Sequence, residues 1–380
     1  MKKKIFNGLV ISFFLIINIT LFMYIYKDNI KDTFDNQDMM FKTDGRLIEE
    51  DEINTLEDSK IDGQNLSFDT DLYYYYGLLS KKEQKLYKQV YANVNQLSST
   101  FIPVDEYNLD EVKKIIECVF YDHPEFFWLD NSYGYKYTKD GKVVQLLINF
   151  NYTKDNIQYY KKQFDTSVNS IINEAKKYKT NFEKEKFVHD KLIKMTSYNK
   201  NEILSQSAYS VLINGQSVCA GYSRAFQYIM NKMNIRTYYI TGISKENHAW
   251  NIIKLDGEYY NVDLTWDDKN GVSYTYFNKN DKDFSLTHRR TGLSLNLPTC
   301  NGIKYYYQEV ISNSNSKSNA NNNSNNVISK EPIISDDSNI TSNKNEEKPL
   351  IEESNSNSDS NSDNDSNQEQ HEIDSKEFNP

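Results

Sequence analysis

Apolar side chains between residues 73 and 200 recur mainly at helical spacing, interrupted by one run with a strand-like pattern. Two of the helices are introduced by capping boxes, Ser80-Lys-Lys-Glu83 and Thr180-Asn-Phe-Glu183, in which the first and last side chains satisfy each other's backbone amides. The expected elements are a helix after Ser80, a helix over 110–120, a strand over 143–152, and helices over 154–177 and 181–196. We therefore predict an α/β segment here, without recognisable chemistry of its own.

A second helical pattern follows Gln216, with apolar side chains at 225, 226, 229, 230 and 233. We expect Ser217 or its neighbour to cap its start and Asn234 to end it in a left-handed conformation. Cys219 then falls in the first turn, where unpaired amides and the helix dipole stabilise an anion such as a thiolate. A single cysteine at a helix start is also compatible with a buried structural thiol, so this position needs support from other residues.

A hairpin is predicted further along, because two strand-like runs over 248–255 and 258–265 flank Asp256-Gly257, a favoured two-residue turn. If Leu255 lies opposite Glu258, then His248 lies opposite Thr265 and Trp250 opposite Asp263. Alternation along the strands places His248, Trp250 and Asp263 on one face. The side chains of His248 and Asp263 become diagonal neighbours within hydrogen-bonding reach, unless a bulge at the turn moves Asp263 to the other face.

Cys219, His248 and Asp263 together have the order of a Cys-His-Asp triad. A carboxylate beside a histidine orients the imidazole and stabilises its protonated form, which in turn stabilises a nearby thiolate. Each residue by itself is also compatible with a structural role. Their combination on a helix start and a hairpin favours catalysis.

These motifs resemble the transglutaminase-like superfamily, in its bacterial cell-surface branch. The resemblance covers roughly residues 73–307. It is carried by Val218-Cys-Ala-Gly-Tyr-Ser-Arg-Ala-Phe226, His248-Ala-Trp-Asn251 and Tyr260-Asn-Val-Asp-Leu-Thr-Trp-Asp-Asp268, with Asp122-His-Pro-Glu-Phe-Phe-Trp128 upstream and Tyr276-Phe277 and His288 downstream.

The resemblance implies an α+β, papain-like core in which a nucleophile helix packs on an antiparallel sheet. It also implies that Cys219 is the nucleophile, His248 the general base and Asp263 the residue that orients it. Cys219 would attack an amide or peptide carbonyl of a protein or cell-wall peptide and form a thioester. Transfer to an amine and hydrolysis by water both remain open, as does a non-catalytic binding or assembly module with the same fold.

An oxyanion hole would need two donors. The Cys219 amide is one, and Tyr209 and Gln216 are alternatives for the second; we expect Trp250 to line the groove. No cofactor is called for. His123, His189, His248, His288 and His371 lack metal-ligand spacing such as H-E-x-x-H, so we expect no metal.

The N-terminus predicts a membrane location. Residues 5–26 carry no charge and match the ~20 residues that cross a bilayer, and the three lysines before them favour a cytoplasmic N-terminus. We expect an uncleaved, single-pass signal anchor with an extracytoplasmic catalytic domain; a cleaved signal peptide is the alternative, although the run is longer than the usual ~7–15 residues.

The net charge of −10 is concentrated at the C-terminus. Residues 311–380 hold 14 acidic and 5 basic side chains together with 16 Ser and 17 Asn, a composition typical of disorder. The remaining chain is close to neutral, which disfavours a nucleic-acid partner. Three cysteines exclude a disulfide framework; Cys118 and Cys300 are either paired with each other or free.

The expected organisation has six parts, and the sequence sets no oligomeric state. They are a basic cytoplasmic N-terminus (1–4), a transmembrane anchor (5–26), an acidic stalk (27–72), an N-terminal α/β part (73–200), a catalytic core (201–310) and an acidic tail (311–380).

Overall fold

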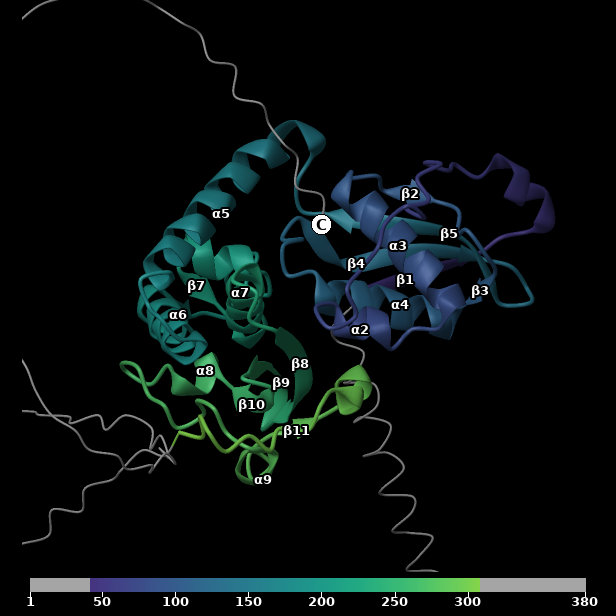
Figure 1. The fold of residues 1–380 in the computed structure, drawn as a ribbon. Coiled ribbons are helices and arrows are strands. Elements are labelled where there is room, and N and C mark those ends of the chain that lie inside the picture. The colour runs from purple at the N-terminus through teal and green to yellow at the C-terminus, as the bar shows by residue number, and fades with distance from the viewer. Residues whose placement is uncertain (1–41, 308–380) are drawn as a thin grey trace, which may run out of the picture. The chain divides into compact units, whose positions relative to one another are not determined.

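The computed structural model describes residues 42–307, which form two larger sheets and a two-stranded sheet of β6 and β7 (Figure 1). The first sheet has the strand order β1-β4-β5-β2, with β3 also pairing with β5. Its strands are β1 (Lys42–Leu47), β2 (Thr100–Phe101), β3 (Tyr107–Asn108), β4 (Leu129–Tyr137) and β5 (Lys142–Phe150), and the accompanying helices are η2 (Glu50–Thr55), α2 (Tyr74–Gly77), α3 (Lys81–Asn95) and α4 (Leu109–Asp122). Only β1 and β4 pair in parallel among these strands.

The second sheet is antiparallel and has the order β10-β9-β8-β11. Helix α7 packs on β8 and β9, and α5 and α6 pack against α7 (teal in Figure 1). The strands are β8 (Thr237–Ser244), β9 (Glu246–Leu255), β10 (Glu258–Val262) and β11 (Arg289–Arg290), and the long helices are α5 (Lys154–Ala175), α6 (Asn181–Met195) and α7 (Cys219–Lys232). The short elements are β6 (Ser197–Tyr198), η3 (Ser210–Asn214), β7 (Gln216–Ser217), α8 (Leu264–Asp267), α9 (Asp281–Phe284) and η4 (Gly292–Asn296).

The local signals in the sequence set the helix starts. Both predicted capping boxes form, at the N-termini of α3 and α6. Asn234, two residues beyond α7, has a φ of 63°, the left-handed conformation expected there. Every helix expected between 73 and 200 is present, and the predicted α+β class is confirmed.

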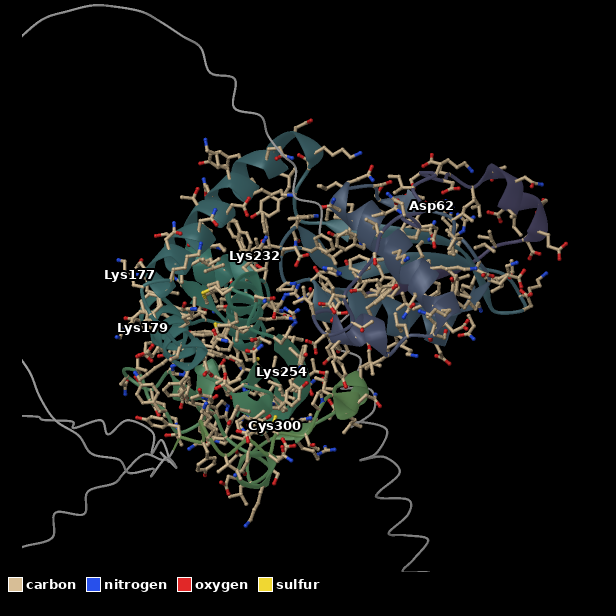
Figure 2. The ribbon with its side chains drawn as sticks, in the orientation of Figure 1. Asp62, Lys177, Lys179, Lys232, Lys254 and Cys300 are labelled. Carbon is tan, nitrogen blue, oxygen red and sulfur yellow. The ribbon has the colours of Figure 1, made fainter. Side chains whose placement is uncertain are left out.

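The expectation of a stalk over 27–72 is wrong for its described part, residues 42–72. Strand β1 pairs with β4, and Ile48 and Phe68 are buried. Asp71 bonds Lys254 of β9 at 3.1 Å (Lys254 is labelled in Figure 2). The sequence pattern does not predict this strand, because all six residues of β1 are exposed and show no apolar alternation.

Helix α7 is tied to the C-terminal end of α4 by two buried side chains. Arg224 donates to the carbonyls of Phe120 and His123 at 2.6 and 3.0 Å, and Gln227 donates to that of Tyr121 at 2.9 Å. The last carbonyls of a helix have no partner within it, so these donors satisfy groups that would otherwise be costly to bury. Helices α5 and α6 also pack against α7. Both precede residue 201, where the catalytic core was expected to begin, so the packing around the second sheet extends across that boundary.

The expected anchor, its basic N-terminus and the acidic tail lie outside the described residues. Within residues 42–307, none of the helices is both long and apolar enough to cross a membrane.

Candidate active site

Cys219 is the first residue of α7, as the sequence predicts, and its side chain is half-buried. The amides of the first turn have no acceptor within the helix, so they favour an anion at this position. Val218, the neighbour of Ser217, is the N-cap residue, although its side chain makes no capping hydrogen bond. The Ser217 hydroxyl instead donates to the Ser205 carbonyl at 2.8 Å.

The hairpin register is confirmed, because Leu255 lies opposite Glu258 and Asn251 opposite Val262. The strand is shorter than expected, however. It ends at Val262, and Asp263 caps helix α8 by accepting the amides of Thr265 and Trp266 on Oδ1, at 2.9 and 3.1 Å. The expected pairing of Thr265 with His248 is therefore wrong, since the helix turns Thr265 out of the ladder.

His248 bridges the other two candidate residues. Its Nε2 lies 2.7 Å from Oδ2 of Asp263, and Cys219 is a close enough neighbour of the imidazole to help raise its pKa. Because Nε2 is engaged by Asp263, Nδ1 is the ring nitrogen left for the thiol. The structure thus brings together the three side chains of the predicted triad, on α7, on β9 and directly after β10.

The electrostatics favour a charged imidazole. Burial by itself lowers the pKa of His248, but the Asp263 carboxylate and the contact with Cys219 outweigh burial and raise the pKa to about 10. Burial would likewise raise the pKa of Asp263, yet its contacts with His248 and His288 hold that pKa below its usual range. An ionised carboxylate and an imidazolium next to a thiol form the arrangement that stabilises a thiolate.

A second histidine contacts the same carboxylate. His288 Nε2 lies 3.0 Å from Oδ2 of Asp263, the oxygen that His248 also contacts. No local spacing in the sequence connects His288 to residue 263, so this contact could not be predicted.

The donors of these residues are also close enough together to hold a metal ion. Among the described residues, His248, Asp263 and His288 form such a group, with donor atoms within 4.8 Å of one another. The two histidines contact one carboxylate oxygen at hydrogen-bond distances, and the other oxygen is occupied by two backbone amides. This pattern is that of a hydrogen-bonded cluster rather than of ligands spread around an ion.

The other predicted site residues do not have the surroundings that their expected roles need, although the ring of Trp250 lies 6.1 Å from that of His248. Tyr209 is buried, and its hydroxyl donates to Gln163 of α5 at 3.3 Å, so it does not suit an oxyanion hole. Gln216 is exposed and accepts from Asn199 at 2.6 Å. Trp250 is 1% exposed and cannot line an open groove. The hydrogen-bond donor on its ring is directed at Asn261, 3.2 Å away.

Two aromatic side chains missed by sequence analysis lie at the site. Burial and the neighbouring charges of Cys219, Glu246 and Asp263 raise the pKa of Tyr198, which is 45% exposed. The ring of Trp266 lies 6.2 Å from that of His248. Tyr198 belongs to β6, which pairs with β7 just before Cys219. A two-residue strand carries no periodic signal that could have indicated this placement.

The remaining thiols are free and buried. Burial raises the pKa of Cys118 well above its ordinary value and also raises that of Cys300 (labelled in Figure 2). A buried thiol with a raised pKa is a poor nucleophile at neutral pH. Cys219 is thus the thiol with both access and a basic partner.

The comparisons with known proteins agree with the motifs. Residues 166–264, which include Cys219, His248 and Asp263, match the family model of the transglutaminase-like superfamily. The resemblance expected from the sequence is therefore confirmed over residues 166–264. The comparison with curated proteins gave no significant match.

Solved structures with similarity to the chain are distant. One, named "Crystal structure of a TGase", is 15% identical and covers 50% of this chain and 55% of its own, with a TM-score of 0.27. A "Putative Cysteine Protease" from Cytophaga hutchinsonii is 16% identical over 33% of this chain and 51% of its own, with a TM-score of 0.25. A "putative protease" from Parabacteroides distasonis is 12% identical over 32% of each chain, with a TM-score of 0.22. The chain thus spans about half the length of the first two.

Proposed function

We propose that this protein is a thiol enzyme that cleaves or exchanges amide bonds of proteins or cell-wall peptides through a thioester on Cys219. The observation that supports this most strongly is the double contact of His248, with Asp263 on one side and Cys219 on the other. A buried histidine held by a carboxylate is common, but one that also adjoins a half-buried thiol at a helix N-terminus has the parts of a nucleophilic site.

In the first half-reaction, Sγ of Cys219 attacks the carbonyl carbon of the amide. The carbon–sulfur bond forms while the carbonyl π electrons move to oxygen. As the tetrahedral intermediate collapses, the carbon–nitrogen bond breaks and His248 gives its proton to the departing nitrogen. The products are an acyl-thioester and ammonia or an amine. The Cys219 amide at the start of α7 is suited to stabilise the oxyanion.

In the second half-reaction, water or an amine attacks the thioester carbonyl. His248, now neutral, accepts a proton from the attacking group, and the carbon–sulfur bond breaks to regenerate the Cys219 thiolate and the imidazolium. Water gives a carboxylic acid, whereas a lysine amine gives a new amide. Asp263 stays ionised throughout and keeps the ring oriented.

The test uses the purified full chain with a glutamine-containing peptide and a labelled primary amine. Amine incorporation would indicate transamidation, ammonia release alone would indicate deamidation, and fragments of the peptide would indicate peptidase activity. Replacing the nucleophile (Cys219→Ala) should lower any of these rates at least a thousandfold, by about the amount that other nucleophile deletions cost. Cys300→Ala serves as the matched control and should retain activity.

Retention of turnover in Cys219→Ala would refute the mechanism. If wild type shows no turnover and iodoacetamide labels Cys118, Cys219 and Cys300 equally slowly, the chain is better explained as a binding or assembly module.

We also propose that residues 5–26 anchor the enzyme in the cell membrane with the catalytic domain outside the cytoplasm. The uncharged length and the preceding lysines support this orientation. Protease added to intact cells should then degrade the domain, and carbonate washing should leave it in the membrane fraction. Recovery of the full-length chain in the cytosolic fraction would contradict the anchor.

A further inference from the structure

We propose that His288 is a positioning residue of this site, which holds Oδ2 of Asp263 through its Nε2–H and thereby sets how strongly Asp263 binds the proton of His248. The proposal rests on the proposed function for its catalytic consequence, but not for the hydrogen bond itself.

The carboxylate of Asp263 is fully occupied. Oδ1 accepts the backbone amides of Thr265 and Trp266, and Oδ2 lies within hydrogen-bond distance of the Nε2 atoms of His248 and His288, at 2.7 and 3.0 Å. An ionised carboxylate has about four acceptor positions, and each of these has a partner here. A carboxylate buried in this way needs every one of these donors to stay ionised.

The protonated nitrogen of His288 can be assigned from its partners. Asp263 is an acceptor, so Nε2 of His288 must carry the hydrogen. Nδ1 lies 2.8 Å from the Thr287 hydroxyl, which can donate to it. A neutral ring with its hydrogen on Nε2 satisfies both contacts.

The ring of His288 is also fixed in position. Its side chain is fully buried, and its centroid lies 4.0 Å from that of Phe284, 5.0 Å from Trp266 and 5.1 Å from Trp250. Within residues 42–307, His288 contacts no carboxylate other than Asp263, and the aromatic rings around it keep its Nε2–H directed at that carboxylate. The aromatic contacts would persist if the ring were a phenyl group, which allows the hydrogen bond to be tested separately from packing.

Sharing an oxygen changes what Asp263 does to His248. Each donor to Oδ2 withdraws part of its negative charge, so a second N–H weakens the attraction between Asp263 and the His248 proton. In the proposed mechanism His248 must release that proton to the leaving nitrogen and be neutral for the second half-reaction. Release of the proton to the leaving nitrogen is faster when His248 holds the proton less tightly. Among the described residues, Tyr198 of β6, Asp267 of α8 and Tyr276 are the other titratable groups close to this carboxylate, and Cys219 of α7 is close to His248.

The experiment compares His288→Phe, which keeps the aromatic packing and removes the N–H, with His288→Gln, whose amide N–H can take the place of Nε2. The full chain is labelled with ¹⁵N-histidine, and the ring resonances of His248 are followed with pH in the presence of EDTA. We expect His288→Phe to raise the midpoint of the His248 titration by about one pH unit, since a hydrogen bond to a charged group is worth about that much. His288→Gln should leave the midpoint near that of wild type.

Turnover supplies the second readout. His288→Phe should lower kcat at neutral pH about tenfold with little change in KM, because the His248 proton rather than substrate binding is affected. His288→Gln should restore most of the lost rate. Thermal unfolding followed by circular dichroism checks that both variants remain folded.

Several outcomes would overturn the proposal. The first is an unchanged or lowered His248 midpoint in folded His288→Phe, and the second is a His288→Gln variant that behaves like His288→Phe. The third is a wild-type titration that changes when EDTA is withdrawn, which would place an ion on the cluster. If the midpoint shifts as expected while wild type shows no amide turnover, the hydrogen bond stands and the proposed enzyme function fails instead.

Discussion

The chain holds two buried histidine–aspartate pairs whose aspartates lie four residues apart in the sequence, and only one of the pairs adjoins a reactive group. His248 contacts Asp263 at 2.7 Å, and His189 of α6 contacts Asp267 at 3.2 Å. His189 lies in α6 and His248 in β9, and both aspartates are almost completely buried.

The pairs differ in what occupies the second ring nitrogen. In His189 it contacts another carboxylate, Asp190, at 3.1 Å, and these contacts outweigh burial and raise the pKa of His189. Asp190 is in turn bonded by Tyr274 at 2.8 Å. In His248 the second nitrogen is left for Cys219. The His189–Asp267 pair is therefore closed on both sides by protein groups, whereas the His248–Asp263 pair is open to a thiol.

The comparison teaches that a histidine–aspartate contact does not by itself define a catalytic site. A closed pair can only stabilise the fold, because its proton has no acceptor that reaches substrate. The following predictions test this difference between the two pairs.

The largest expected effect comes from removing the charge of each aspartate. Asp263→Asn should lower turnover by about a thousandfold or more, because a neutral amide favours the wrong tautomer of His248. Asp267→Asn should retain turnover within about tenfold but lower the free energy of unfolding by about 3 kcal/mol, since it breaks a buried ion pair. Steady-state kinetics and urea unfolding distinguish these results. Equal losses of turnover would show that the two pairs are not functionally distinct.

A second prediction concerns the thiol. His248→Gln should slow iodoacetamide labelling of Cys219 at pH 7 by about tenfold or more, because the thiolate loses its imidazolium partner. His189→Gln should leave that rate within about twofold of wild type. Labelled peptides are quantified by mass spectrometry, with Cys118 and Cys300 as slow internal references. A similar slowing in both variants would mean that His189 also supports the thiolate.

A smaller effect is expected from Glu185, which lies beside the closed pair. Burial raises its pKa to about 8, although bonding to Asn278 and the charge of His189 oppose this. A folded-state pKa above the ordinary 4.5 means that the folded chain binds the proton more tightly, so its contribution to stability is full below about pH 4.5 and falls as pH rises to about 8.

Glu185→Gln should therefore flatten the dependence of stability on pH over this range. At pH 8 the variant should be more stable than wild type by a few kcal/mol, because the protonated carboxyl that the fold requires is then no longer lost. Thermal unfolding between pH 5 and 8.5 measures this. A variant whose pH profile parallels that of wild type would contradict the buried, protonated carboxyl.

The sequence could predict features that depend on neighbours along the chain. Capping boxes at Ser80 and Thr180 act within one helical turn, and the Asp256-Gly257 turn fixes the register of the hairpin that carries His248. The placement of Cys219 at a helix start is likewise local. From these local signals the sequence predicts that Cys219, His248 and Asp263 lie close together.

Features that depend on distant segments could not be predicted in this way. His288 reaches Asp263 across 25 residues of mostly irregular chain. Trp250 was expected in a groove, but Phe284 and His288 cover its ring. Nothing in the spacing of Tyr209 showed that its hydroxyl would turn towards α5. Alternation identifies the face of a strand, but not which later segment covers that face.

The pairing of β1 with β4 has a mechanical consequence. Residues Lys42–Leu47 run parallel to Ser132–Tyr137, and β1 is the first described strand of the chain. A force applied ahead of Lys42 pulls along the axis of β1, so the ladder bonds to β4 are loaded together in shear instead of opening one after another. An enzyme held at its N-terminus would therefore meet tension first at this strand pair, on a different sheet from the one that carries His248.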